Sequence, residues 1–313
     1  MEKNNKKQRG AALLTALFIM TLVAIVATAM STKVQVDIYR TQLIIFHDKL
    51  YFASQAVAFW AMSELNDPKK QFAKVDADGM VSQYPKAMAN IYPSVTLKGG
   101  LYDLQARYNL NNLVNKKLSL GFANLLGKVI PKIKTPEKIN VALAINDWVS
   151  PYDLGVGKDK YLSYYLSQKP PYYPSHQLMS SNSELRLINN VSAGTYLALQ
   201  PYITTLPEST PININTAPKQ VLMALSTSIN EENIKELNQA KGKKGIKQIA
   251  MIRELLTKLN IPSDQITLES DYFLSVAYAS SENFNFTVYT LLKRNHKKGT
   301  LSVSIVRESF NVF

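Results

Sequence analysis

The first 65 residues hold the longest apolar stretch of the chain. Residues 11–30 carry no charge, and a polar, basic segment of ten residues precedes them. A helix rises about 1.5 Å per residue and the hydrocarbon core of a bilayer is about 30 Å thick, so about twenty apolar residues can cross it. The pattern therefore predicts a transmembrane helix over 11–30.

The helical pattern continues beyond this span. Between 34 and 65, apolar residues recur at steps of three and four, with charged residues between them. Neither glycine nor proline occurs from Ala11 to Asp67, and Pro68 then ends the helix. We predict one helix over 11–67, with one half in the membrane and the other half packed on a soluble domain.

The charges around the span set its orientation. Four basic residues and one acid, Glu2, lie in the segment before it. Because positive charge favours the cytoplasmic side of a membrane, the N-terminus is expected in the cytoplasm and the chain after Met30 on the other side.

The middle of the chain changes from strand patterns to helical ones. Alternating polar and apolar residues predict a strand pair over 94–112, with Gly99-Gly100 as a two-residue hairpin turn. From 113 to 262, helical spacing alternates with loops that contain proline or glycine. The helices expected there are 117–129, 136–149, 181–189, 193–200, a short helix after Pro218, 231–239 and 245–259.

Strand patterns return in the last third of the chain. Residues 271–279, 285–293 and 300–306 are rich in β-branched and aromatic side chains. Antiparallel strands packed on the amphipathic half of the long helix would form an α+β fold. The helical block at 113–262 would then be a large all-α inserted domain between two parts of that core, 68–112 and 263–313.

Composition narrows the possible chemistry. The 313 residues include 36 Lys and Arg against 23 Asp and Glu, no cysteine and three histidines. Without cysteine there is no disulfide or thiol nucleophile, and the isolated histidines make a histidine-based catalytic or metal centre a poor candidate. A basic balance suits nucleic acid or anionic lipid, but we prefer a solvated surface. No catalytic constellation emerges, and we do not expect an enzyme.

The start of the apolar span resembles a known processing signal. Lys7-Gln8-Arg9-Gly10 followed by Ala11-Ala12-Leu13-Leu14-Thr15 is similar to the type III signal of type IV pilins and pseudopilins. The resemblance implies that 1–10 is a leader, that prepilin peptidase cuts between Gly10 and Ala11, and that Ala11 is methylated. An ordinary signal anchor with a chance glycine is the alternative.

Position 15 departs from most of that family. Most members carry Glu at the fifth mature position, where its carboxylate is thought to neutralise the N-terminal ammonium of another subunit. Such pairing is plausible because unpaired charge in lipid is costly. Thr15 stands there in this chain. In this respect it resembles the K-type minor pseudopilin of the type II secretion system, which lies at the tip with no subunit ahead of it.

Two further stretches strengthen the resemblance to the K family. Tyr102-Asp-Leu-Gln-Ala-Arg-Tyr-Asn-Leu-Asn-Asn-Leu113 is similar to a motif where the sheet of K subunits gives way to their helical insert. Its asparagines can bond to backbone there.

The sequence Asn213-Ile-Asn-Thr-Ala217 also occurs in K subunits and in helix-hairpin-helix DNA-binding domains. Asn215 or Thr216 is predicted to cap the helix after Pro218.

The resemblance also implies a calcium loop. K subunits carry several acids after an Asp-Trp pair, and this chain keeps Asp147, Asp153 and Asp159. Ser150 replaces a second acid and Lys158 stands where Glu is usual. Calcium prefers six to eight oxygen ligands, so both changes weaken the predicted site.

The resemblance covers nearly the whole chain and implies its function. A K subunit has a pilin-like fold and caps the tip of a periplasmic pseudopilus with the I and J minor pseudopilins. It helps to start assembly and to drive exported proteins across the outer membrane. Other implied partners are further pseudopilins, prepilin peptidase, the inner-membrane secretion platform and the exported proteins. The implied location is the bacterial inner membrane, crossed once, with the C-terminal domain in the periplasm.

One alternative is a type IV pilus or DNA-uptake minor pilin whose helix-hairpin-helix-like insert binds DNA. The segment Lys241-Gly-Lys-Lys-Gly245 has the charge and glycines that phosphate contacts need. It lacks aromatic stacking residues, however, and the span directs it away from the cytoplasm. We therefore expect no nucleic acid. A membrane-anchored enzyme is the third and weakest hypothesis.

Overall fold

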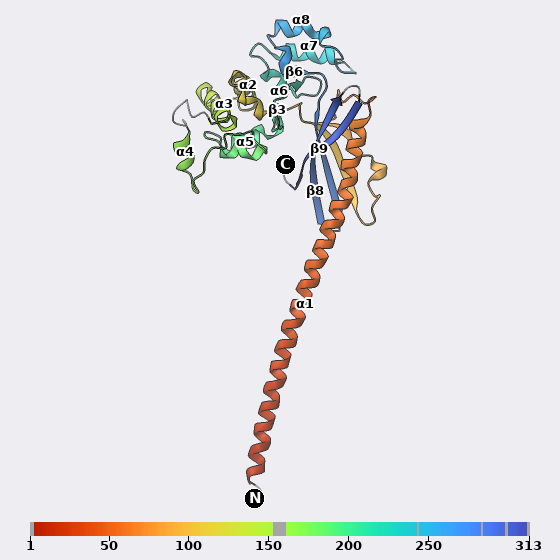
Figure 1. The fold of residues 1–313 in the computed structure, drawn as a ribbon, viewed down its shortest axis with the longest axis vertical. Helices are drawn as coiled ribbons and strands as arrows, with labels where there is room; N and C mark the ends of the chain where they lie inside the picture. The colour runs from red at the N-terminus through yellow and green to blue at the C-terminus, as the bar shows by residue number, and fades with distance from the viewer. Residues whose placement is uncertain (1–2, 153–160, 243, 283, 298–299, 312–313) are drawn as a thin grey trace.

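The computed structural model describes residues 3–152, 161–242, 244–282, 284–297 and 300–311. Helix α1 (Lys3–Asn66), 64 residues long, projects as a stalk from a head that contains the rest of the chain (Figure 1). Its end agrees with the prediction, whereas its start lies inside the expected leader. Every residue from Ala11 to Gln42 is exposed, and the first buried position is Leu50. The helix therefore has a free half and a packed half.

A buried arginine holds the C-terminal end of α1. Arg294 Nε donates to the carbonyl of Leu65 at 2.8 Å, and its Nη2 donates to the carbonyl of Asp67 at 3.3 Å. The guanidinium also lies over the ring of Phe72, 5.6 Å from its centroid. Because the last carbonyls of a helix have no partner within it, this side chain satisfies groups that would otherwise be buried unbonded.

The packed half of α1 lies on a five-stranded antiparallel sheet with the order β1-β2-β7-β8-β9. Its strands are β1 (Met80–Gln83), β2 (Thr96–Asp103), β7 (Tyr272–Ser281), β8 (Phe284–Lys297) and β9 (Thr300–Phe310). Small residues on the helix, Ala53 and Val57 among them, are fully buried against Leu97 and Ala277 of the sheet. The predicted α+β fold and the three C-terminal strands are confirmed, and β1 was not predicted.

The predicted hairpin at Gly99-Gly100 is wrong. Both glycines lie within β2, which runs unbroken beside β7 with Gly99 opposite Ala277. A Cβ atom at Gly99 would lie 2.4 Å from the carbonyl oxygen of Val276 and 2.7 Å from Cγ1 of Val57. Glycine at position 99 therefore allows the helix to approach the sheet closely, and it does not form a turn.

We predict that Gly99→Ala destabilises the fold by about 1–3 kcal/mol, the usual cost of overpacking a core. Urea unfolding of the full-length protein in detergent would measure the loss. Gly194→Ala is the matched control, because a Cβ there meets only Ser192 Oγ at 3.8 Å. That change should stabilise α5 (Ala193–Leu199) slightly. Equal unfolding midpoints for the two variants would contradict the packing argument.

The helical block forms the other side of the head. In Figure 1, α2 to α5 lie to one side of the sheet and α6 to α8 lie beyond its upper end. These helices are α2 (Ser119–Val129), α3 (Thr135–Val149), α4 (Leu162–Leu166), α5 (Ala193–Leu199), α6 (Lys219–Ala224), α7 (Glu231–Lys241) and α8 (Arg253–Lys258). They enclose a large apolar cluster that includes Phe122, Trp148 and Leu222.

Several boundaries in this block differ from the prediction. The segments Asn182–Leu187 and Ile249–Ile252 are 3₁₀ turns, so the helix expected at 245–259 is confined to α8. Of the short strands, β3 (Tyr108–Asn109) lies within the strand pair predicted at 94–112, whereas β4 (Ile203–Thr204), β5 (Ile212–Asn213) and β6 (Ile266–Thr267) were not predicted. They form two parallel pairs, β3 with β4 and β5 with β6. Each pair joins residues more than fifty positions apart, which local patterns cannot reveal.

Candidate functional site

The free half of α1 is the most exposed apolar surface of the described chain. A window of 18 residues within Ala11–Asn66 has a mean hydropathy of 2.5, and none of that window is buried. Thr15 Oγ1 donates to the carbonyl of Ala12 at 2.9 Å and contacts the carbonyl of Ala11 at 3.2 Å. The hydroxyl is thus satisfied by its own helix and needs no partner from another subunit. Helix α1 also runs unbroken through Gly10 and Ala11, and processing between them remains a prediction.

The two sequence motifs meet at a buried carboxylate, Asp103, at the end of β2. Its Oδ2 accepts hydrogen bonds from Asn213 Nδ2 at 3.0 Å, Thr216 Oγ1 at 2.6 Å and Ser270 Oγ at 2.8 Å. Its Oδ1 accepts from the backbone N–H of Gln105 at 2.8 Å. Burial raises the pKa of Asp103, and these four hydrogen bonds act in the opposite direction. The carboxylate joins the sheet to the helical block.

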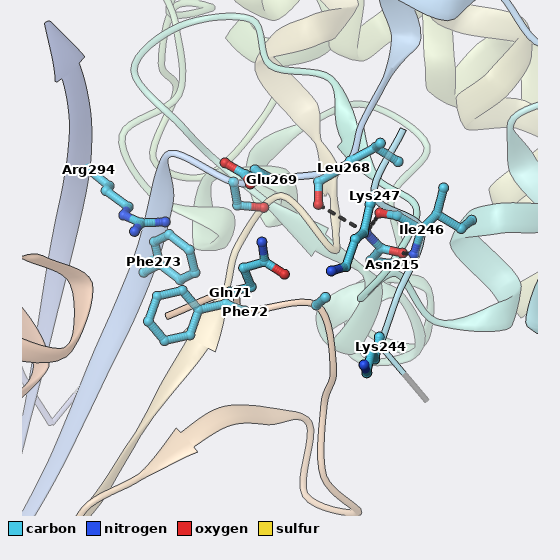
Figure 2. Close-up of a pocket in the computed structure, with 12 residues that line it drawn as sticks. Gln71, Phe72, Asn215, Lys244, Ile246, Lys247, Leu268, Glu269, Phe273 and Arg294 are labelled. Atoms are coloured by element: carbon cyan, nitrogen blue, oxygen red, sulfur yellow. Dashed lines mark hydrogen bonds between the residues drawn. The ribbon is translucent and has the colours of Figure 1, made fainter. Parts of the chain in front are cut away.

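The Asn-Ile-Asn-Thr-Ala motif therefore does not cap a helix as predicted. The residue before α6 is Pro218, with no side-chain cap. Asn215 instead accepts from the N–H of Ile246 at 2.8 Å and donates to the carbonyls of Ile246 at 3.0 Å and Leu268 at 3.1 Å. Figure 2 shows Asn215 between these two segments, in a pocket that extends to Phe72 and Arg294. The motif cross-links segments far apart in sequence.

Asn111 and Asn112 of the other motif form an asparagine clamp, in which their side chains bond to distant backbone segments of the helical block. Asn111 Nδ2 donates to the carbonyls of Met179 at 3.0 Å and Leu206 at 2.7 Å. Asn112 forms a reciprocal pair with the backbone of Thr210, at 2.8 and 2.9 Å. The prediction that these amides bond to backbone is confirmed. Their partners lie about 70 to 100 residues away.

Only part of the expected calcium segment lies among the described residues. Asp147 is half-buried at the end of α3, and Asp153, Asp159 and Lys158 lie outside the described residues. The hydroxyl of Ser150 lies 3.3 Å from Asn146 Nδ2. Trp148 donates to Glu184 Oε2 at 3.3 Å and packs on Tyr165. Within the described ranges no three His, Asp or Glu side chains gather as a metal site.

We predict that the full-length chain binds calcium weakly, because Ser150 and Lys158 replace two carboxylates of the family pattern. The double variant Ser150→Asp with Lys158→Glu should bind calcium at least tenfold more tightly, since ligand charge sets the affinity of such loops. Isothermal titration would measure both. Lys132→Glu, a charge change at an exposed site, is the control. A double variant that binds no tighter than the native chain would disprove the assignment of these residues.

Gly245, the last residue of the basic segment 241–245, packs closely against the rest of the head. Gly242 and Gly245 have positive φ angles of 49° and 75°. A Cβ at Gly245 would lie 2.6 Å from the Cβ of Ala73 and 3.3 Å from Asn215 Oδ1. Of its lysines, Lys241 is half-buried and Lys244 is exposed, and Lys243 lies outside the described residues. The loop is held by Asn215, an arrangement that the sequence did not indicate.

Comparison with known proteins finds several similar chains that share one name. The profile of "Type II secretion system (T2SS), protein K" matches residues 106–208. The type II secretion system protein K of Aeromonas hydrophila is 27% identical over 271 residues, covering 78% of each chain. That of Pseudomonas aeruginosa is 25% identical over 310 residues, covering 95% of this chain and 91% of the relative. The chain is therefore similar to type II secretion system K proteins over most of its length.

A solved structure shares the fold of this chain. It is a chain of the crystal structure of the GspK-GspI-GspJ complex from the type 2 secretion system of enterotoxigenic Escherichia coli. The TM-score is 0.69 at 18% identity, covering 87% of this chain and 99% of the other. The matched family profile begins beside Arg107 and ends at Glu208, and so includes the asparagine clamp. The sequence analysis missed Asp103 as the joining residue. The sequence offered one signal for it. Asp103 is a charged residue two positions from Leu101, so the two side chains lie on the same face of a strand.

Proposed function

We propose that this chain is a minor pseudopilin that caps the tip of a periplasmic pseudopilus of the type II secretion system. In this role it joins the I and J subunits, starts assembly and helps to drive exported proteins across the outer membrane. It would cross the inner membrane once, with its head in the periplasm. The role requires no catalytic chemistry of its own, and the helical block 113–262 would be an insert in a pilin-like core.

The observation that carries the proposal is the division of α1 into an exposed apolar half and a half packed on the sheet. An apolar surface of this extent needs cover, which lipid supplies before assembly and the helices of other subunits supply afterwards. Thr15 supports the tip position, because its hydroxyl is bonded within α1 and offers no charge to a subunit ahead. The likeness to a chain of a K-I-J complex supports the choice of partners.

Co-purification tests the proposal. The full-length chain in detergent would be mixed with candidate I and J minor pseudopilins, and the mass of the product determined. A stable one-to-one-to-one complex is expected. The control replaces I and J with the major pseudopilin, which should not form that complex. A chain that stays alone, or that retains DNA in place of I and J, would overturn the proposal.

A further inference from the structure

A cavity of about 570 Å³ lies between the helical block, the turn after β2 and the connection that follows α1. Its charged lining comprises Lys74, Asp78, Asp103, Arg107 and Lys241, and Tyr102 and Tyr202 also line it. Asp78 and Lys74 are exposed at the rim, whereas Arg107 and Lys241 are half-buried. The cavity adjoins the smaller pocket of Figure 2, with which it shares Ala73 and Asn215, whereas Arg294 lines only the smaller pocket of the two.

The guanidinium of Arg107 is desolvated without a strong counter-charge. Among the described residues no carboxylate forms an ion pair with it and no acceptor takes its hydrogen bonds. Burial lowers its pKa, against weaker opposing effects of Tyr102 and Asp103. Asp103 cannot replace a dedicated partner, because its oxygens already accept four hydrogen bonds from other groups. An arginine in this state retains most of its capacity to donate.

Lys241 presents a second cation to the same cavity. It is the last residue of α7, and burial lowers its pKa to about 8. In the described part of the chain its ammonium has no salt bridge, whereas Lys219 and Lys258, two of the lysines in other helices, pair with Glu231 and Glu236. Two half-buried cations that face one cavity cost free energy, and a bound anion would offset that cost.

We propose that this cavity binds an oxyanion, a carboxylate or a phosphate, between Arg107 and Lys241. The planar guanidinium matches the two oxygens of such a group, and the ammonium adds a point charge in the same cavity. The single rim acid, Asp78, leaves the cavity with a positive balance. The oxyanion is either a free solute or an acidic side chain of a bound protein, and both sources present the same chemistry to these two residues.

Isothermal titration of the full-length protein in detergent tests the site. The probes are inorganic phosphate and a short peptide with one glutamate and blocked ends. Saturable binding is expected for at least one of them, weakened about tenfold or more in Arg107→Gln and in Lys241→Met, since each removes a charge-assisted hydrogen bond. Lys244→Met is the matched control, because this exposed lysine of the same loop lines the other pocket. It should leave the affinity unchanged.

The two probes distinguish the source of the oxyanion. Binding of phosphate would identify the oxyanion as a free solute. Binding of the peptide alone would identify it as an acidic side chain of a bound protein. Melting curves show whether each variant is folded. If Arg107→Gln is unfolded, the affinity of Lys241→Met for the probes tests the proposal. Absence of saturable binding of both probes, or equal affinities in the native chain and Lys241→Met, would overturn the proposal. Neither result would affect assembly with I and J.

Discussion

Gly10→Ala should leave the chain as an unprocessed precursor that fails to assemble. The resemblance of 7–15 to a type III signal implies that prepilin peptidase cuts after Gly10. In the structure the bond between Gly10 and Ala11 lies inside α1. Glycine is about 1 kcal/mol less favourable in a helix than alanine, which makes this the weakest turn of the segment. Alanine both strengthens the turn and adds a side chain at the cut.

Mass spectrometry of the chain purified from cells that contain the peptidase would measure this processing. The native chain should begin at a methylated Ala11, and the variant should retain residues 1–10. Gln8→Ala, two positions away in the same leader, is the control and should mature normally. Maturation of Gly10→Ala would remove the pilin-type assignment of the signal and leave an ordinary signal anchor.

The second large effect is expected at the carboxylate that joins sheet and helical block. Asp103→Ala removes the carboxylate that accepts hydrogen bonds from four buried groups, those of Gln105, Asn213, Thr216 and Ser270. Each unsatisfied group costs about 1–3 kcal/mol, although the two hydroxyls can reorient, so we expect a total loss of about 3–5 kcal/mol. For a chain of this size the melting temperature should fall by on the order of 10 °C.

Thermal unfolding of the full-length protein in detergent measures the effect. Asp103→Asn keeps the shape and one acceptor and should cost less than Asp103→Ala. Asp78→Ala is the control, since this exposed acid should change stability by less than about 0.5 kcal/mol. A melting temperature of Asp103→Ala equal to that of the Asp78 variant would show that the carboxylate does not hold the two parts together.

The elements that the sequence predicted well are those encoded by a continuous local pattern. Pro68 predicts where α1 ends. Twenty apolar residues followed by helical spacing predict the helix itself. The strands β7, β8 and β9 follow from runs of β-branched and aromatic residues. The prediction failed at Gly99-Gly100, where a local turn signal competed with a tertiary constraint. Only the packing of Val57 and Val276 around Gly99 explains why glycine is there.

The polar motifs show the same limit. Asn215 and Thr216 stand where a helix cap would be, yet their side chains bond to Ile246 and to Asp103. In the sequence Arg294 looks like an ordinary strand residue. Its side chain nevertheless donates a hydrogen bond to the end of a helix more than 220 residues earlier. A short polar side chain can bond to its own turn or to a distant strand at similar energy, and local sequence does not distinguish the two.

Local sequence patterns were enough to predict the long apolar helix, the mixed helical and sheet class and the resemblance to the K family. These depend on periodicity and on contiguous motifs, which act over a few residues. The tertiary structure alone decided that Asp103 joins the two motifs and that Arg107 and Lys241 face one cavity. Their partners lie more than a hundred positions apart, so only the folded chain brings them together.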